Sequence, residues 1–157
     1  LGSQLICSLS SFLSDMSMHV MNLGHSQYGM SLVREALCIV KEHGYSPSAE
    51  MLISYAHAVT RVEFMQRSSN ATISSGSALA TVAQIKNLMS EFSHQRGRNY
   101  DFTVQLILFR HLESLVTSGL ANEEECTSQI HCAYHDLVSS LNVLNEIPSG
   151  LSQLVEL

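Results

Sequence analysis

Apolar residues recur every three or four positions along most of the chain, which is the spacing of one face of an α-helix and not of a β-strand. Glycines, prolines and polar stretches interrupt this pattern and divide it into segments. Helices are predicted over residues 4–23, 26–43, 47–66, 78–95, 100–119 and 123–147. Because most connections are short, neighbouring helices should run antiparallel. The sequence therefore predicts an all-α fold, an antiparallel bundle of about six helices.

Local signals agree with several of these boundaries. Gly24 and Gly44 follow the last apolar position of the first two segments, where glycine commonly ends a helix. Ser46 precedes Pro47, so the serine oxygen can accept an orphan amide hydrogen, while proline at the first helical position lacks one. Asn122 is the expected cap of the last segment. The third helix is thus predicted to begin at Pro47.

Two segments differ in how their apolar residues are distributed. The segment 4–23 carries one apolar stripe, made of Leu5, Leu9, Phe12, Leu13, Met16, Val20 and Leu23. In contrast, residues 104–109 are apolar on nearly every side of their helix, so neighbours must cover them on several faces. We therefore expect the segment 100–119 to be the central helix.

The chain length of 157 residues corresponds to one domain with its own core. Residues 67–77 are rich in serine and small polar side chains, which predicts a loop between helical halves 4–66 and 78–147. Residues 4–157 are expected to form a single helical domain, and two three-helix units are the alternative arrangement. Leu-Gly-Ser at 1–3 resembles the remnant of a cleaved affinity tag.

Composition and charge say more about the function of the chain than about its fold. Hydrophobic residues make up 45% and charged residues 14%, which is typical of a folded chain and not of a disordered one. Fourteen acidic residues outnumber eight basic ones, giving a formal charge of −6, and no basic stripe is present, so nucleic acid is not an expected partner. No segment is apolar enough to cross a membrane. Four dispersed cysteines favour a reducing, cytoplasmic location.

Motifs for catalysis or metal binding are incomplete. His131 and His135 are four residues apart on one helix face, a spacing that can offer two ligands to zinc, but a metal site needs a third and usually a fourth. The sequence contains no GxSxG, HExxH or glycine-rich phosphate loop. We therefore expect no catalytic residues, no metal and no cofactor in this chain, and interpret it as a non-enzymatic segment.

The last predicted helix has one clean apolar seam, and from it we predict the partner-binding residues Tyr134, Leu137, Leu141 and Leu144. Such a seam can line a groove that takes an amphipathic helix of a protein partner. The alternative is that the same seam is ordinary core. The alternative function is a structural helical subunit or segment of a large intracellular assembly, such as a tether or transcription complex. The sequence leaves the partner's identity and the oligomeric state open.

Residues 82–120 contain a Gln-Ile pair, then Phe-x-x-Gln-Leu-x-Leu-Phe, then Ser-Gly-Leu. This order resembles the C-terminal helical region of the Unc-51-like autophagy-initiating kinases, over about a third of the chain. The matching positions are Gln84, Ile85, Phe102, Gln105, Leu106, Leu108, Phe109, Leu115, Ser118, Gly119 and Leu120. The resemblance implies microtubule-interacting-and-transport (MIT) three-helix modules, a kinase domain elsewhere in a longer protein, and docking of a regulatory autophagy subunit.

Overall fold

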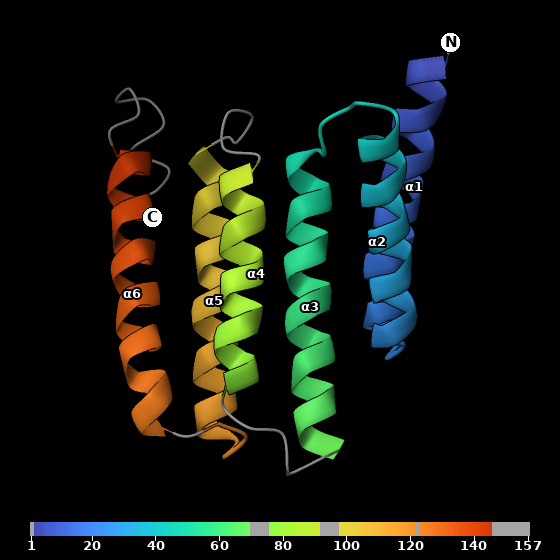
Figure 1. The fold of residues 1–157 in the computed structure, drawn as a ribbon. Helices are drawn as coiled ribbons and strands as arrows, with labels where there is room; N and C mark the ends of the chain where they lie inside the picture. The colour runs from blue at the N-terminus through green and yellow to red at the C-terminus, as the bar shows by residue number, and fades with distance from the viewer. Residues whose placement is uncertain (1, 70–75, 92–97, 122, 146–157) are drawn as a thin grey trace.

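The computed structural model describes residues 2–69, 76–91, 98–121 and 123–145. Its helices are α1 (Gly2–Asn22), α2 (Ser26–Glu42), α3 (Ala49–Ser69), α4 (Gly76–Glu91), α5 (Arg98–Thr117) and α6 (Glu123–Asn145). Successive helices lie side by side and run in opposite directions (Figure 1). These described residues contain no strand, so the prediction of an all-α fold with about six helices is confirmed. In the same ranges, no helix is both long and apolar enough to span a membrane.

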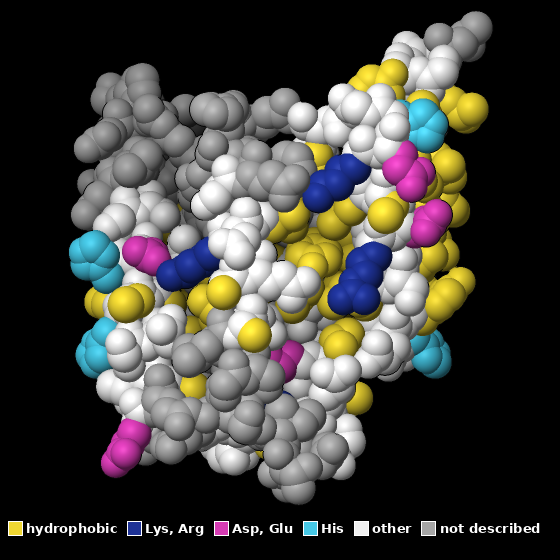
Figure 2. Space-filling model, viewed as in Figure 1, with side chains coloured by type: hydrophobic (Ala, Val, Ile, Leu, Met, Phe, Trp, Pro, Cys, Tyr) yellow, Lys and Arg dark blue, Asp and Glu magenta, His cyan; other side chains and the backbone are white. Residues whose placement is uncertain are grey.

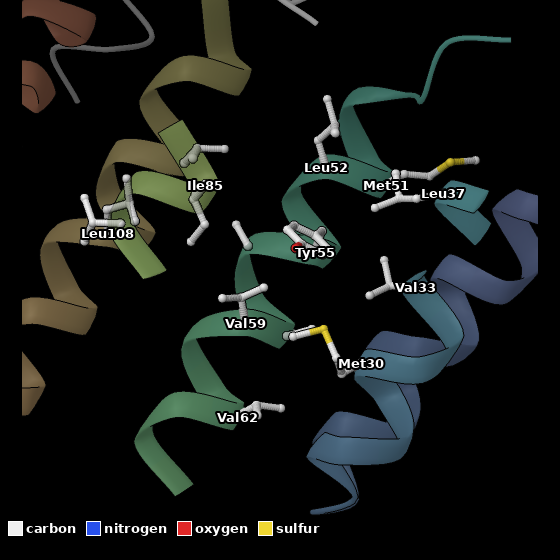
Figure 3. Close-up of a cluster of buried hydrophobic side chains, with 14 of the residues drawn as sticks. Met30, Val33, Leu37, Met51, Leu52, Tyr55, Val59, Val62, Ile85 and Leu108 are labelled. Atoms are coloured by element: carbon white, nitrogen blue, oxygen red, sulfur yellow. The ribbon is translucent and has the colours of Figure 1, made fainter. Parts of the chain in front are cut away.

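Helix α3 occupies the centre of the bundle. It contacts α1 and α2 on one side and α4 and α5 on the other, whereas α5 packs mainly against α3 and α6 (Figure 1). The expectation that residues 100–119 form the central helix is therefore wrong. Buried side chains of α2 and of α4 and α5 meet on the two sides of α3 (Figure 3). The residues of this continuous cluster include Val33, Tyr55, Val59, Ile85 and Leu108.

Helix α1 presents most of its apolar stripe outward, while Leu13 is half-buried and Val20 is buried. Leu5, Phe12 and Leu23 are 71%, 59% and 67% exposed, while Ser10 and Ser17 are fully buried. Amphipathicity favours the opposite orientation for a helix with one apolar stripe. The inward face combines three serines with Val20 and Met21 near the end of the helix, and the serines allow α1 to approach its neighbours closely and to hydrogen-bond with them. The outward stripe is the largest departure from what the sequence pattern favours.

The contact between α1 and α2 depends on a glycine. The Ser17 hydroxyl donates to the Gly29 carbonyl oxygen at 2.7 Å. A Cβ at Gly29 would lie 2.3 Å from Met21 Cγ and 2.9 Å from the Ser17 carbonyl oxygen, both closer than van der Waals contact. Nearby, the Ser14 and Ser54 hydroxyls join α1 to α3 at 3.1 Å. These hydrogen bonds explain how serines serve as core residues here.

Two helix ends differ from their predicted positions. The third helix begins at Ala49, two residues after the expected start, because the Ser48 hydroxyl and not that of Ser46 caps it, accepting from the Met51 amide at 3.3 Å. The same helix continues to Ser69, and the Ser68 and Ser69 hydroxyls donate to carbonyl oxygens one turn earlier. The predicted loop 67–77 is therefore helical at 67–69 and 76–77, and residues 70–75 lie outside the described part of the chain.

Candidate functional site

A groove of about 690 Å³ lies along α3 and α5, next to the turn between α1 and α2. In the view of Figure 1, α5 lies behind α4 and α1 lies behind α2. Its apolar lining residues are Met21, Phe64, Met65, Leu106 and Ile107. The volume falls in the range of ordinary ligand pockets, and the groove is open to solvent and not an enclosed cavity. This shape fits an elongated ligand better than an enclosed small molecule.

Each wall of the groove is one face of a helix whose other face is core. On α5, Val104, Leu108, Leu112 and Leu115 are all fully buried. Leu106 and Ile107 lie between these positions on the helix and are half-buried, so they face the groove. The α5 centre is thus apolar all round, as the sequence shows, but its neighbours leave one side uncovered. At a rise of 1.5 Å per residue, the lining segment 103–114 is about 16 Å long.

The groove is positively charged in an otherwise acidic protein. Arg61 and Arg110 line it, and no Asp or Glu among the described residues does. The Arg61 guanidinium donates to the Asn22 side-chain oxygen at 3.2 Å, which holds it at the end of α1. Burial, and then the nearby positive charge of Arg61, hold the pKa of His57 below its usual value. Two cations beside an apolar floor favour a ligand with both apolar and anionic groups.

A buried ionic network joins α3 to α5 beside the groove. The Glu63 carboxylate accepts from Arg67 Nε at 3.0 Å and lies 3.1 Å from His111 Nε2, and all three side chains are almost fully buried. The Arg67 guanidinium also donates to the Leu120 carbonyl oxygen at 2.8 Å, just after α5. Because His111 also lines the groove, this network fixes the spacing of its two walls.

The environment of Glu63 keeps its carboxylate ionised. Burial alone raises the pKa of Glu63, but hydrogen bonds from His111 and Thr81 and the positive charges of His111 and Arg67 outweigh burial. The net effect is a pKa below the ordinary value. The carboxylate therefore acts as a buried anchor for α3, α4 and α5.

Sequence reasoning missed both the groove and this network. One signal was available: Glu63 and Arg67 are four residues apart in a helix that is otherwise apolar on that face, a spacing at which opposite charges meet. Arg61 and Arg110 also interrupt largely apolar surroundings in a chain with few cations. The pairing with His111 is separated by 48 residues and has no local signal.

The residues predicted to bind a partner lie elsewhere, on α6. Tyr134 is 58% exposed, and its ring centroid lies 6.1 Å from that of Phe109 on α5. Leu137 and Leu141 are half-buried, and Leu144 lies in the last turn of α6, with a side chain outside those described. None of the four lines the groove. Their role in binding stays a prediction, and they identify a second candidate surface.

His131 and His135 are both exposed on α6. His135 Nδ1 lies 3.8 Å from the Asp136 carboxylate, and Asp136 also accepts from Lys86 Nζ of α4 at 3.3 Å. Among the residues that the structure describes, no three His, Cys, Asp or Glu side chains are grouped so as to hold a metal ion. The two histidines therefore have no third ligand in this part of the chain.

Three of the eleven resemblance positions in 82–120 are buried packing positions. Ile85, Leu108 and Leu115 are buried core residues, and Gly119 adopts a positive φ of 67° in the turn after α5. Leu106 lines the groove. Comparison of the chain with protein-family models, curated proteins and solved structures finds no significant match.

Proposed function

We propose that this chain is a non-catalytic helical docking domain, which binds an amphipathic helical segment of a partner protein in the groove between α3 and α5. The observation that carries the proposal is the pairing of an apolar floor with Arg61 and Arg110. Helix-in-groove binding uses apolar anchors on one face of the guest helix, and charged residues at the edges set its orientation.

The dimensions of the groove define the guest. A wall of about 16 Å accommodates two to three helical turns, so apolar anchors at positions i, i+4 and i+7 fit along it. Each fully buried anchor contributes roughly 1.5–3 kcal/mol before ordering costs. Three anchors together contribute about 5–9 kcal/mol, and the charge pairs must offset the ordering costs for the affinity to reach the micromolar range, which corresponds to about 8 kcal/mol.

The charges of the groove define the guest further. In an acidic chain with formal charge −6, a cationic groove gives a local attraction for an anionic ligand. A partner helix with Asp or Glu beside its apolar anchors can pair with Arg61 and Arg110, whereas a basic helix is repelled. The proposed partner segment is therefore acidic and amphipathic.

The resemblance of 82–120 supports a narrower proposal, that the chain is the regulatory-subunit-docking part of a cytoplasmic autophagy-initiating kinase. The support is that one matching position, Leu106, lies in the groove, while others such as Leu108 build the wall behind it. In this proposal the kinase domain belongs to another part of a longer protein. The two MIT-like units of that proposal correspond to residues before and after the 67–77 region.

The alternative function, a structural subunit of a large assembly, is favoured by a different observation. The outward stripe of α1 exposes Leu5, Phe12 and Leu23 to solvent, as expected of a surface that another protein covers. Docking and scaffolding make different demands on the groove. Only docking requires that a short acidic helix binds there with measurable affinity.

A peptide titration tests the docking proposal. The probe is a fluorescein-labelled, helix-favouring 14-residue peptide with leucines at i, i+4 and i+7 and glutamates on both sides of them, and binding is followed by fluorescence anisotropy. We expect a Kd in the micromolar range that weakens with salt, at least tenfold weaker binding to the double variant Arg61→Glu/Arg110→Glu, and no binding of a lysine-flanked version of the peptide.

The matched control is Arg34→Glu, which reverses the charge of an exposed arginine on α2 that does not line the groove. We expect this variant to bind within about twofold of the wild type. If Tyr134→Ala weakens binding while the double arginine variant does not, the docking site is the α6 seam. If neither peptide binds the wild type, the proposal is wrong.

A further inference from the structure

The outward face of α1 has the spacing of a coiled-coil seam. Leu5, Leu9, Phe12, Met16, His19 and Leu23 follow one another at intervals of 4, 3, 4, 3 and 4 residues, which are the a and d positions of a heptad repeat. All six are exposed, and Figure 2 shows hydrophobic side chains along the edge of the molecule that α1 forms. None of them lines the groove between α3 and α5.

The area and charge of this seam identify its occupant. Its large apolar side chains expose roughly 500 Å² together, at the upper end of patches on monomeric proteins. That is more than half of the about 800 Å² per partner that a standard interface buries, and the polar residues beside the seam supply the remainder. Helix α1 contains no Lys or Arg and one acidic residue, Asp15. It therefore offers little to a charged partner and little repulsion to a copy of itself.

We propose that two copies of this chain associate through α1, with the two seams packed antiparallel about a twofold axis. An isologous interface of this kind closes on itself and buries both stripes at once. Antiparallel packing places Leu5 opposite Leu23 of the other copy and Phe12 opposite Met16, where sulfur and aromatic ring contact favourably. The same register places each His19 opposite Leu9 of the other copy and keeps the two imidazoles apart, whereas parallel packing would bury both imidazoles in one layer of the seam.

The inward face of α1 explains why the seam is available. Ser14 and Ser17 hold α1 against its neighbours through hydrogen bonds, and Val20 and Met21 add buried apolar contacts, so the six seam residues are not used for the fold of the chain itself. Serines inside and leucines outside are a reversed pattern for a helix of a monomer. Self-association removes the reversal, because the outward stripe becomes the core of the dimer.

Sedimentation velocity at 1–200 µM tests the proposal on the complete 157-residue chain. We expect a dimer with twice the 17.3 kDa mass of the chain, and at least a 100-fold weaker association for Phe12→Asp, which places a charge at the centre of the seam. The control Ser11→Asp adds the same charge at an exposed position outside the seam and should remain dimeric. Circular dichroism is used to check that both variants keep the helical content of the wild type.

Cross-linking tests the orientation. In a background where the exposed cysteines Cys7, Cys38 and Cys132 are serine, mixed Leu5→Cys and Leu23→Cys chains should form the mixed disulfide in preference to either homodimer. Preferred homodimers overturn the antiparallel arrangement. A wild type that stays monomeric to 200 µM, or a Phe12→Asp variant as dimeric as the wild type, overturns the proposal altogether. Phe12→Asp should bind the acidic peptide within about twofold of the wild type. Loss of self-association with peptide binding intact shows that the two proposals can fail independently of each other.

Discussion

Replacing Arg67 by methionine gives the sharpest test of how the bundle is held together. The Arg67 side chain is 1% exposed, donates to Glu63 at 3.0 Å and donates to the Leu120 carbonyl oxygen at 2.8 Å. Methionine fills a similar volume but supplies neither the charge nor the donors. The Glu63 carboxylate then remains buried after losing its guanidinium partner.

The structure sets the expected magnitude. Removing one partner of a buried ion pair costs about 3–5 kcal/mol, because the other charge stays behind in a poorly solvated place. Glu63 keeps its hydrogen bonds with His111 and Thr81, so we expect the lower end of this range, about 3 kcal/mol. A domain of this size has about 5–15 kcal/mol of stability in total, and the melting temperature should fall by roughly 10 °C.

Urea unfolding followed by circular dichroism at pH 7 measures this loss. The double variant Glu63→Gln/Arg67→Met removes both charges, and we expect it to recover at least half of the lost free energy of unfolding, because the uncompensated charge is gone. Arg34→Met, at an exposed arginine, is the matched control and should change stability by less than about 0.5 kcal/mol. The reasoning is refuted if Arg67→Met loses no more than this control.

The same network gives a pH dependence with a definite sign. Because the pKa of Glu63 in the folded chain lies below its ordinary value, the unfolded chain binds the extra proton first as pH falls. The contribution of Glu63 is therefore complete above the ordinary carboxyl pKa and is lost as pH falls toward the folded value. In Glu63→Gln, the decline of stability between pH 5 and 3 should be shallower than in the wild type.

Three further changes have expected outcomes that standard measurements can check. Gly29→Ala should lower the free energy of unfolding by about 1–3 kcal/mol, because the new methyl group contacts Met21 and the Ser17 backbone oxygen. Gln105→Leu should raise stability by about 1 kcal/mol, since its buried side-chain oxygen has no hydrogen-bond partner within the described part of the chain. The pKa of His57 in the folded chain lies below 6.5, so the unfolded chain binds more protons just below pH 6.5. The stability of the wild type should therefore fall more between pH 7.5 and 5.5 than the stability of His57→Gln does. Thermal melts across this pH range measure the difference.

Each of these changes has a control. Gly2→Ala meets no atom within 4 Å and should leave stability unchanged, so equal effects at both glycines would contradict the close approach of α1 and α2. Gln84→Leu removes a hydrogen bond with the Tyr55 hydroxyl and should destabilise slightly, opposite in sign to Gln105→Leu. His43→Gln alters an exposed histidine on the end of α2. Identical pH profiles for the two histidine variants would contradict the account of His57.

The sequence predicted helices well because their periodicity is local. Apolar spacing and terminal glycines located all six elements, and the errors were at ends where a side-chain hydrogen bond decides, as with Ser48 rather than Ser46. It could not predict which face of α1 points inward. That choice depends on Gly29, which lies on another helix and allows serines to pack closely.

The groove was less predictable than the fold. Sequence periodicity shows that the centre of α5 is apolar on all sides, but not that α3 and α6 leave Leu106 and Ile107 uncovered. The cationic edge arises from Arg61 and Arg110, which are 49 positions apart in sequence and meet at the groove through the packing of α3 beside α5. The α6 seam was predicted because one helix alone displays it. A site between helices has no such single-segment pattern.

Mapping the acidic peptide onto the protein by NMR tests the central claim most directly. Amide chemical shifts of the ¹⁵N-labelled chain are followed while the 14-residue glutamate-flanked peptide is added. The account predicts that the largest changes occur in 57–65 of α3 and 103–114 of α5, including Arg61 and Arg110, and that α6 changes little. Changes centred on Tyr134 and Leu137, or no saturable changes at millimolar peptide, would contradict it.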